Sequence, residues 1–269
     1  MRNEGLNVYS TLHSDTLPYQ LSNEILGWKN TMNNGNLQRT LSKLLQSGSR
    51  SNPAMNTLLN DYTKYHVVLV VEGGFLVLIF LLLSLFFWTQ LKRTPQAAQH
   101  TWTFEKKVYA SFGALSIGVG LLIALLVAVN ATTVLDPQHG FSLLIDSLGT
   151  PKAGTQMDKL YQAFNTWVQS GSTNMPSLIQ SKIHERMAFH TTRVIVCSVL
   201  LVVFVALSTR IWRTLIKKSR VRESKWGLKE TALLVSGAAT ITLSLLLMVM
   251  VIANMQGAFA PLALTLAFG

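Results

Sequence analysis

Residues 67–88 read VVLVVEGGFLVLIFLLLSLFFW, a run in which Glu72 is the only charged side chain. At 1.5 Å per residue in a helix, a run of this length extends ~33 Å, enough to cross the ~30 Å hydrocarbon core of a bilayer. Transfer of so many apolar side chains from water to lipid is strongly favourable. The stretch therefore predicts a transmembrane helix.

Three further segments have the same character, and the composition agrees with them. They are residues 109–129, 194–211 and 231–253. Of the 269 residues, 49% are hydrophobic and only 13% are charged, whereas roughly a quarter are charged in soluble domains. We therefore expect an all-α integral membrane protein with four transmembrane helices.

Positive charge is concentrated in two short connections, between the first and second spans and between the third and fourth. Together they hold twelve Lys or Arg residues against three Glu, a net charge of +9, whereas the rest of the chain carries +2. Short loops rich in Lys and Arg stay in the cytoplasm. We expect both connections inside and both chain ends outside the plasma membrane, with no role for nucleic acid as a partner.

The second of these connections is basic enough to bind anionic lipid. Each Lys or Arg near a charged membrane surface contributes on the order of 1 kcal/mol. An acidic protein partner is the alternative. The residues concerned are Arg210, Arg213, Lys217, Lys218, Arg220, Arg222, Lys225 and Lys229.

The chain also repeats itself. QSGSRSNP at 46–53 reappears 123 residues later as QSGSTNMP at 169–176. At a spacing of 124 residues, His66 matches His190, Trp102 matches Trp226, Gly113 matches Gly237 and Asn130 matches Asn254. Small, drifting spacings indicate duplication. Because each copy holds two spans, both copies have one orientation, and we expect two tandem parallel repeats, 19–138 and 139–261.

Each copy predicts a helical hairpin outside the membrane. An amphipathic outer helix over 37–47 precedes a long helix over 53–91, and in the second copy 158–170 precedes 176–218. Apolar residues in the outer helices recur at the spacing of one helical face. The long helices extend about 13 residues, roughly 20 Å, beyond the bilayer. The outer helices can therefore fold back on them.

Two segments lie outside the repeats, and one residue limits the chemistry. We expect 1–18 to be irregular, and 262–269 to form an apolar tail on the outer surface or within the outer domain. Cys197 is the only cysteine, so neither a disulfide within the chain nor a cysteine-based metal site can form. A small outer domain without disulfides suits a bacterial envelope protein better than an animal cell-surface protein.

Glu72 is the one acidic residue within a span, where a charge is costly enough to mark a functional candidate. Gly73 and Gly74 beside it allow another helix to approach closely. Arg193, next to the start of the third span, is the nearest basic partner by depth. An ion pair between Glu72 and Arg193 would be structural, whereas an unpaired Glu72 facing a wet cavity would indicate proton or cation handling. We favour the structural ion pair.

Four polar residues lie in equivalent positions at the outer ends of the spans: His66, His190, Asn130 and Asn254. They could form a ligand or metal site, because neutral imidazole is a common metal ligand. Polar side chains also collect where helices leave the hydrocarbon. We favour this second interpretation and assign no metal.

The sequence contains no nucleotide-binding, serine-hydrolase, zinc-protease or Cys-x-x-Cys motif. We therefore expect no cofactor and a non-enzymatic membrane subunit within a transport, secretion or envelope assembly. It would bind a membrane protein, or a second copy of itself, through its outer hairpins and bundle surface. The alternative is a small transporter or channel subunit with a pathway between the repeats and Glu72 as the coupling group.

Overall fold

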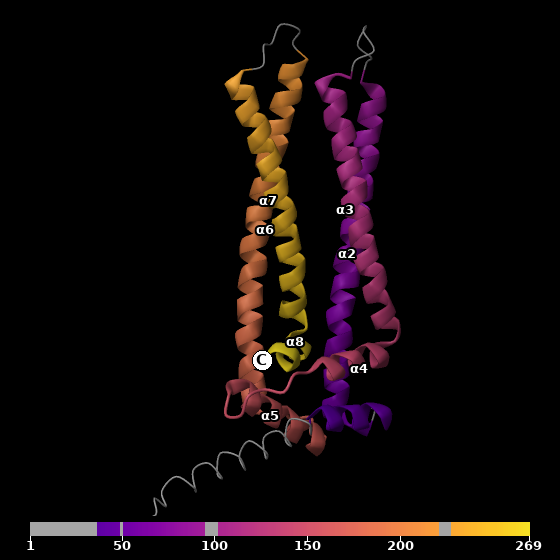
Figure 1. Ribbon diagram of the computed structural model, residues 1–269, viewed down its shortest axis with the longest axis vertical. Helices are drawn as coiled ribbons and strands as arrows, with labels where there is room; N and C mark the ends of the chain where they lie inside the picture. The colour runs from indigo at the N-terminus through magenta and orange to yellow at the C-terminus, as the bar shows by residue number, and fades with distance from the viewer. Residues whose placement is uncertain (1–36, 49–50, 95–101, 221–226) are drawn as a thin grey trace, which may run out of the picture.

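The computed structural model describes residues 37–48, 51–94, 102–220 and 227–269, and these residues form helices and no strand (Figure 1). The predicted irregular segment 1–18 lies outside them. Within the described part, the helices long and apolar enough to cross a membrane are α2 (Pro53–Arg93), α3 (Phe104–Leu135), α6 (Ser177–Ser219) and α7 (Leu228–Phe259). The prediction of an all-α chain with four candidate transmembrane helices is confirmed.

The long helices pair as two antiparallel hairpins, α2 with α3 and α6 with α7, which stand side by side (Figure 1). We call the end where each hairpin reverses direction the turn end. The opposite end, which we call the domain end, carries the shorter helices and the C-terminus. These helices are the segment 37–46, α4 (Pro137–Ser147), α5 (Gln156–Ser170) and α8 (Pro261–Phe268).

The start of α2 is determined by its cap. The side-chain oxygen of Asn52 accepts a hydrogen bond of 2.9 Å from the main-chain N–H of Met55, and Pro53 occupies the first helical position, where a missing N–H costs nothing. The Asn52 amide nitrogen donates to the main-chain oxygen of Val168, 2.8 Å away. One side chain thus begins α2 and attaches it to the end of α5.

An amphipathic α5 covers the domain end. Thr155 caps it by accepting a hydrogen bond from the N–H of Asp158 (3.2 Å). It stops at Gly171, whose φ of 62° is left-handed and therefore suits glycine. Phe164 and Trp167 are buried on its inner face. The observed bounds begin two residues before the predicted 158–170.

A continuous hydrophobic core fills the domain end, outside the predicted spans. The four short helices and the first turns of α2 and α6 contribute to it. Its fully or nearly buried members include Leu37, Leu41, Met55, Leu58, Phe141, Ile145, Leu160, Phe164, Val168, Ile179, Leu262 and Leu266. Because residues from both halves of the chain share this core, it fixes the two hairpins to one another.

The short helices α4 and α8 were not predicted as helices. Each follows a long helix after a single non-helical residue and begins with proline: Asp136 precedes Pro137, and Ala260 precedes Pro261. The structure folds the predicted apolar tail into α8 and buries Leu262, Thr265 and Leu266 in the domain end. Burial of these side chains holds α8 against the domain end, while Phe268 stays exposed.

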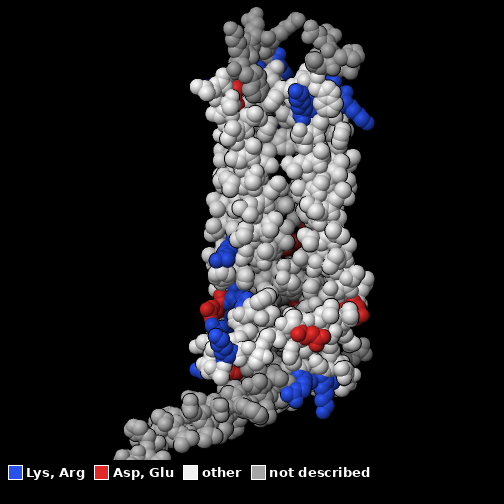
Figure 2. All heavy atoms as spheres, in the orientation of Figure 1, with Lys and Arg blue, Asp and Glu red and all other residues white. Residues whose placement is uncertain are grey.

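The surface of the long helices fits a lipid environment. Large apolar side chains such as Leu81, Leu121 and Val202 are exposed along them. Figure 2 shows that, on this face, Lys, Arg, Asp and Glu gather toward the two ends and leave a largely uncharged band between. Such a band matches the hydrocarbon core of a bilayer. The chain is therefore a multi-pass membrane protein.

Candidate functional site

The four polar residues at the domain-side ends of the spans join in two pairs. His66 Nδ1 lies 2.7 Å from Asn130 Oδ1 between α2 and α3, and His190 Nδ1 lies 2.9 Å from Asn254 Oδ1 between α6 and α7. Each Asn Nδ2 donates to the carbonyl four residues earlier in its own helix, at 2.8 and 2.7 Å. Because the amide oxygen can only accept, Nδ1 of each imidazole donates. Each pair joins the helices of one hairpin.

Hollows open beside both imidazoles. The α2 hollow, of about 390 Å³, lies between α2, α4 and α8 and includes Tyr62, Tyr65 and His66. The α6 hollow, of about 210 Å³, is lined by Lys182, Glu185, Arg186, Phe189, His190 and Gly269. Within the described ranges, no three His, Cys, Asp or Glu side chains come together as a metal site would require. The aromatic and basic side chains that line the hollows make them candidates for binding organic groups or anions.

Glu72 lies inside the bundle without a partner. Both carboxylate oxygens are buried and have no hydrogen bond among the described residues. Glu72 follows Asp61 by eleven residues, which places both on one face of α2. Asp61 accepts a hydrogen bond of 2.8 Å from the main-chain N–H of Ala263 in α8. Glu72 is thus on the side of α2 that faces the second hairpin.

The neighbouring glycine brings α2 and α3 together. A Cβ at Gly73 would come within 2.4 Å of a methyl group of Val127, so no larger residue fits without displacement. The close approach expected from Gly73 and Gly74 therefore involves Gly73, whereas a Cβ at Gly74 would meet nothing within 4 Å.

Arg193 lies away from Glu72. Its guanidinium carbon stands 3.7 Å from the ring centroid of Phe189, and the side chain is exposed. The ion pairs of the described chain do not include Glu72 with Arg193. A long Arg side chain can extend toward water and lipid headgroups while its stem stays in apolar surroundings. The favoured ion pair with Arg193 is therefore not among those of the described residues, and the Glu72 carboxylate is unpaired there.

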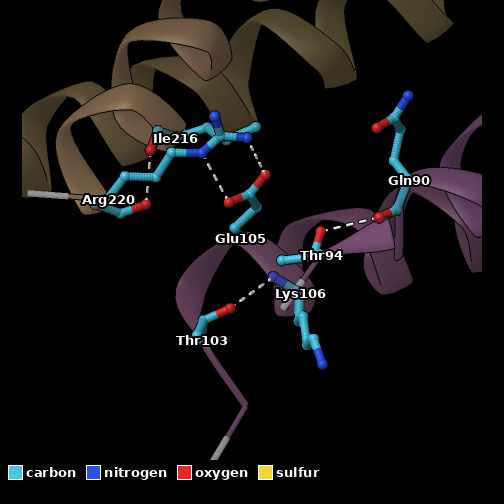
Figure 3. Close-up of polar contacts among 8 residues, drawn as sticks. Gln90, Thr94, Thr103, Glu105, Lys106, Ile216 and Arg220 are labelled. Carbon is cyan, nitrogen blue, oxygen red and sulfur yellow. Dashed lines mark hydrogen bonds and ion pairs between the residues drawn. The ribbon is translucent and has the colours of Figure 1, made fainter. Parts of the chain in front are cut away.

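An ion pair that the sequence did not reveal joins the hairpins at the turn end. Arg220, at the end of α6, donates from Nε and Nη2 to the two carboxylate oxygens of Glu105, at 2.9 and 2.5 Å (Figure 3). Thr103 caps α3 by accepting from the N–H of Lys106 (3.3 Å), which places Glu105 in the first turn. The hydrogen bonds from Arg220 hold the pKa of Glu105 below its ordinary value. Since Glu105 and Arg220 lie 115 residues apart, only the packing of the hairpins shows the pair.

The basic residues assigned to lipid divide into three groups. Arg220 bonds Glu105, and Lys218 bonds Glu230. Arg222 and Lys225 fall outside the described residues. Those at the turn end without an ion pair among the described residues are Arg210, Arg213, Lys217 and Lys229. This last group has side chains available to contact lipid phosphates.

Tryptophan and glycine make equivalent contacts in both hairpins. A Cβ at Gly113 would lie 3.1 Å from the Trp88 ring, and a Cβ at Gly237 would lie 3.1 Å from the Trp212 ring. The Trp212 ring also meets Phe112 of the other hairpin edge to face, with centroids 4.9 Å apart. The glycines let each ring pack against the facing helix, and Trp212 adds a contact between hairpins.

The described bundle thus offers two His–Asn pairs, an unpaired carboxylate, two hollows and ion pairs at the turn end. The His–Asn pairs and the ion pairs can hold helices together. The carboxylate can bind a proton or cation, and the hollows can bind organic groups or anions. No family model, no curated protein and no solved structure matches the chain, so we infer function from this geometry.

Proposed function

We propose that this chain is a non-enzymatic membrane subunit that binds a partner protein through its domain end, within a transport, secretion or envelope assembly. One observation carries the proposal. Large apolar side chains beyond the predicted spans are exposed there, with Leu135 85%, Leu143 58% and Phe268 73% exposed. Leu143 and Phe268 line the same α2 hollow. Exposed apolar groups on a folded domain mark contact surfaces.

The core beneath this surface supports the proposal. Phe141 and Ile145 of α4 and Leu266 of α8 are buried in it, so these two helices are held in place beneath the exposed side chains. A preorganised surface loses less conformational entropy on binding than a mobile one. The domain end is therefore suited to hold a partner in a defined orientation.

We further propose that the chain consists of two tandem parallel repeats in the plasma membrane, each with a helical hairpin outside. The His66–Asn130 and His190–Asn254 pairs, 124 residues apart, support the duplication. So does the equal length of α3 and α7, 32 residues each. The basic residues at the turn end support a cytoplasmic turn end and an outer domain end.

The partner proposal is tested by purification from native membranes in a mild detergent. Wild-type chain should retain a membrane-protein partner or a second copy of itself, and the double variant Leu143→Ser/Phe268→Ser should lose most of it. Leu228→Ser is the matched control, because Leu228 is 91% exposed at the opposite, turn end. Repeated recovery of wild-type chain alone as a monomer, or equal recovery with the double variant, would contradict the proposal.

The unpaired carboxylate of Glu72 favours a second candidate function, a transporter or channel subunit that moves a proton or cation along the interface between hairpins. Glu72→Gln should abolish the flux of protons or cations into proteoliposomes. The melting temperature of the protein should stay unchanged. Glu185→Gln, the same change at an exposed position, is the control. Equal flux through wild type and Glu72→Gln would remove Glu72 from any transport mechanism.

A further inference from the structure

The α2 and α6 hollows occupy matching positions on their helices but differ in chemistry. His66 in one and His190 in the other lie 124 residues apart, and so do Tyr65 and Phe189. At the same spacing, Tyr62 corresponds to Arg186. The α2 hollow is therefore aromatic, whereas the α6 hollow is cationic.

The cations of the α6 hollow share one face of the helix. Lys182, Arg186 and Arg193 stand at positions i, i+4 and i+11, which fall within a narrow arc of an α-helix. Figure 2 shows basic side chains along the edge of the molecule over α6, toward the domain end. A row of this kind presents its charges to one ligand or one surface.

Acidic residues neutralise only part of this row. Lys182 pairs with Glu185 at 2.8 Å. Arg186 donates from Nη2 to the main-chain oxygen of Gly269 at 2.5 Å, and Arg193 lies over the Phe189 ring. Neither arginine has a carboxylate side chain within ion-pair distance in the described chain. Arg193 thus keeps its donors for an anion, and Arg186 keeps those that do not bond Gly269.

The position of the row along α6 identifies the anion. His190 is fixed to Asn254 where α6 leaves the predicted span, and Arg193 immediately precedes that span, which begins at 194. This is the level of lipid headgroups. Guanidinium groups bind phosphate oxygens with charge-assisted hydrogen bonds, and Phe189, half exposed beside them, can contact the apolar part of a lipid.

We propose that the α6 hollow, with Arg193 above it, binds the phosphate of an anionic phospholipid in the leaflet next to the domain end. Arg186 and Arg193 hold the phosphate, and Lys182 adds positive charge at the far side from the bilayer. This site lies at the opposite end of the bundle from the basic turn end. It does not depend on which protein the domain end binds.

The test uses the full chain in phosphatidylcholine nanodiscs that contain a small fraction of phosphatidylglycerol with a photoactivatable group near its headgroup. After irradiation, the cross-linked peptides are mapped by mass spectrometry, which separates α6 from the turn end. Wild-type chain should be cross-linked within 182–193. Unlabelled phosphatidylglycerol should compete, and phosphatidylcholine and inorganic phosphate should not.

Variants assign the site to its arginines. Arg186→Gln/Arg193→Gln should lower the cross-linking in this segment at least about fivefold, because each basic group contributes on the order of 1 kcal/mol. Arg186→Lys/Arg193→Lys, which keeps the charge, should retain most of it. Lys92→Gln/Arg93→Gln removes the same charge from the last turn of α2 and should leave it unchanged.

Several results would overturn the proposal. Wild-type levels of cross-linking in the Gln variant would show that the arginines do not bind the lipid. Loss in the Lys variant as well would assign them a structural role. Competition by inorganic phosphate would identify a free anion as the ligand in place of a lipid.

Discussion

The ion pair between Glu105 and Arg220 shows how one side chain can join distant parts of this chain. The Glu105 side chain is buried and accepts two hydrogen bonds from Arg220, so loss of its charge weakens both of them. We expect Glu105→Gln to lower the melting temperature in detergent by a few degrees. Glu185→Gln, at an exposed position, should have little effect.

The same pair predicts a pH dependence. The folded-state pKa of Glu105 lies below the ordinary 4.5, so the pair stabilises the folded state fully above that value and loses its contribution as pH falls through the folded pKa. The difference in melting temperature between wild type and Glu105→Gln should be full at neutral pH and shrink below pH ~4. Tryptophan fluorescence at each pH measures it; a difference that grows in acid contradicts the assignment.

Residues of the candidate site were predictable to different degrees. His66 and Asn130 could be placed at one depth because each stands next to the end of an apolar run, and their hydrogen bond follows from an antiparallel hairpin. Glu105 and Arg220 could not be paired, because their contact depends on how the two hairpins pack. The contact between Arg193 and Phe189 could not be predicted either, because an arginine side chain can reach several partners.

At the scale of elements, α8 depends on a contact from another helix. No side chain within its own segment caps α8, and the Asp61 carboxylate accepts from the N–H of Ala263 in its first turn. A carboxylate there also interacts favourably with the helix dipole. Asp61→Ala should therefore release α8 while the spanning helices remain folded.

Hydrogen exchange measures this effect. Loss of a cap costs typically ~1 kcal/mol, so the amides of 261–268 should exchange about fivefold faster in Asp61→Ala, with exchange in the spans unchanged. Asp146→Ala provides a control, because Asp146 is exposed on α4. Unchanged exchange in α8 would show that core packing alone holds it.

Long and short elements differed in how well the sequence predicted them. The long helix predicted over 53–91 ends within two residues of the observed end of α2, Arg93. By contrast, α4 and α8 are 11 and 8 residues long, too short to show a clear helical period. Their signal was a proline at the first helical position, Pro137 and Pro261, recurring 124 residues apart.

At the scale of the molecule, the two hairpins are fastened at both ends. The shared core closes the domain end, and at the turn end Arg220 binds Glu105 while Trp212 meets Phe112. Between these fastenings lies the buried, unpaired Glu72. An interface held at both ends can admit a proton or cation between them without separating the hairpins. Transport would therefore require the Glu72 carboxylate, whereas partner binding at the domain end would not.

Orientation in the membrane decides which end meets which compartment. In a Cys197→Ser background, we expect Thr173→Cys, exposed at the domain end, to react with an impermeant maleimide in intact cells. Lys217→Cys, exposed at the turn end, should react only after permeabilisation, because basic loops stay in the cytoplasm. Reaction of Lys217→Cys in intact cells would show that the orientation in the membrane is the reverse of the proposed one. The domain end would then face the cytoplasm, and its partner and the lipid at Arg186 and Arg193 would have to be sought on that side.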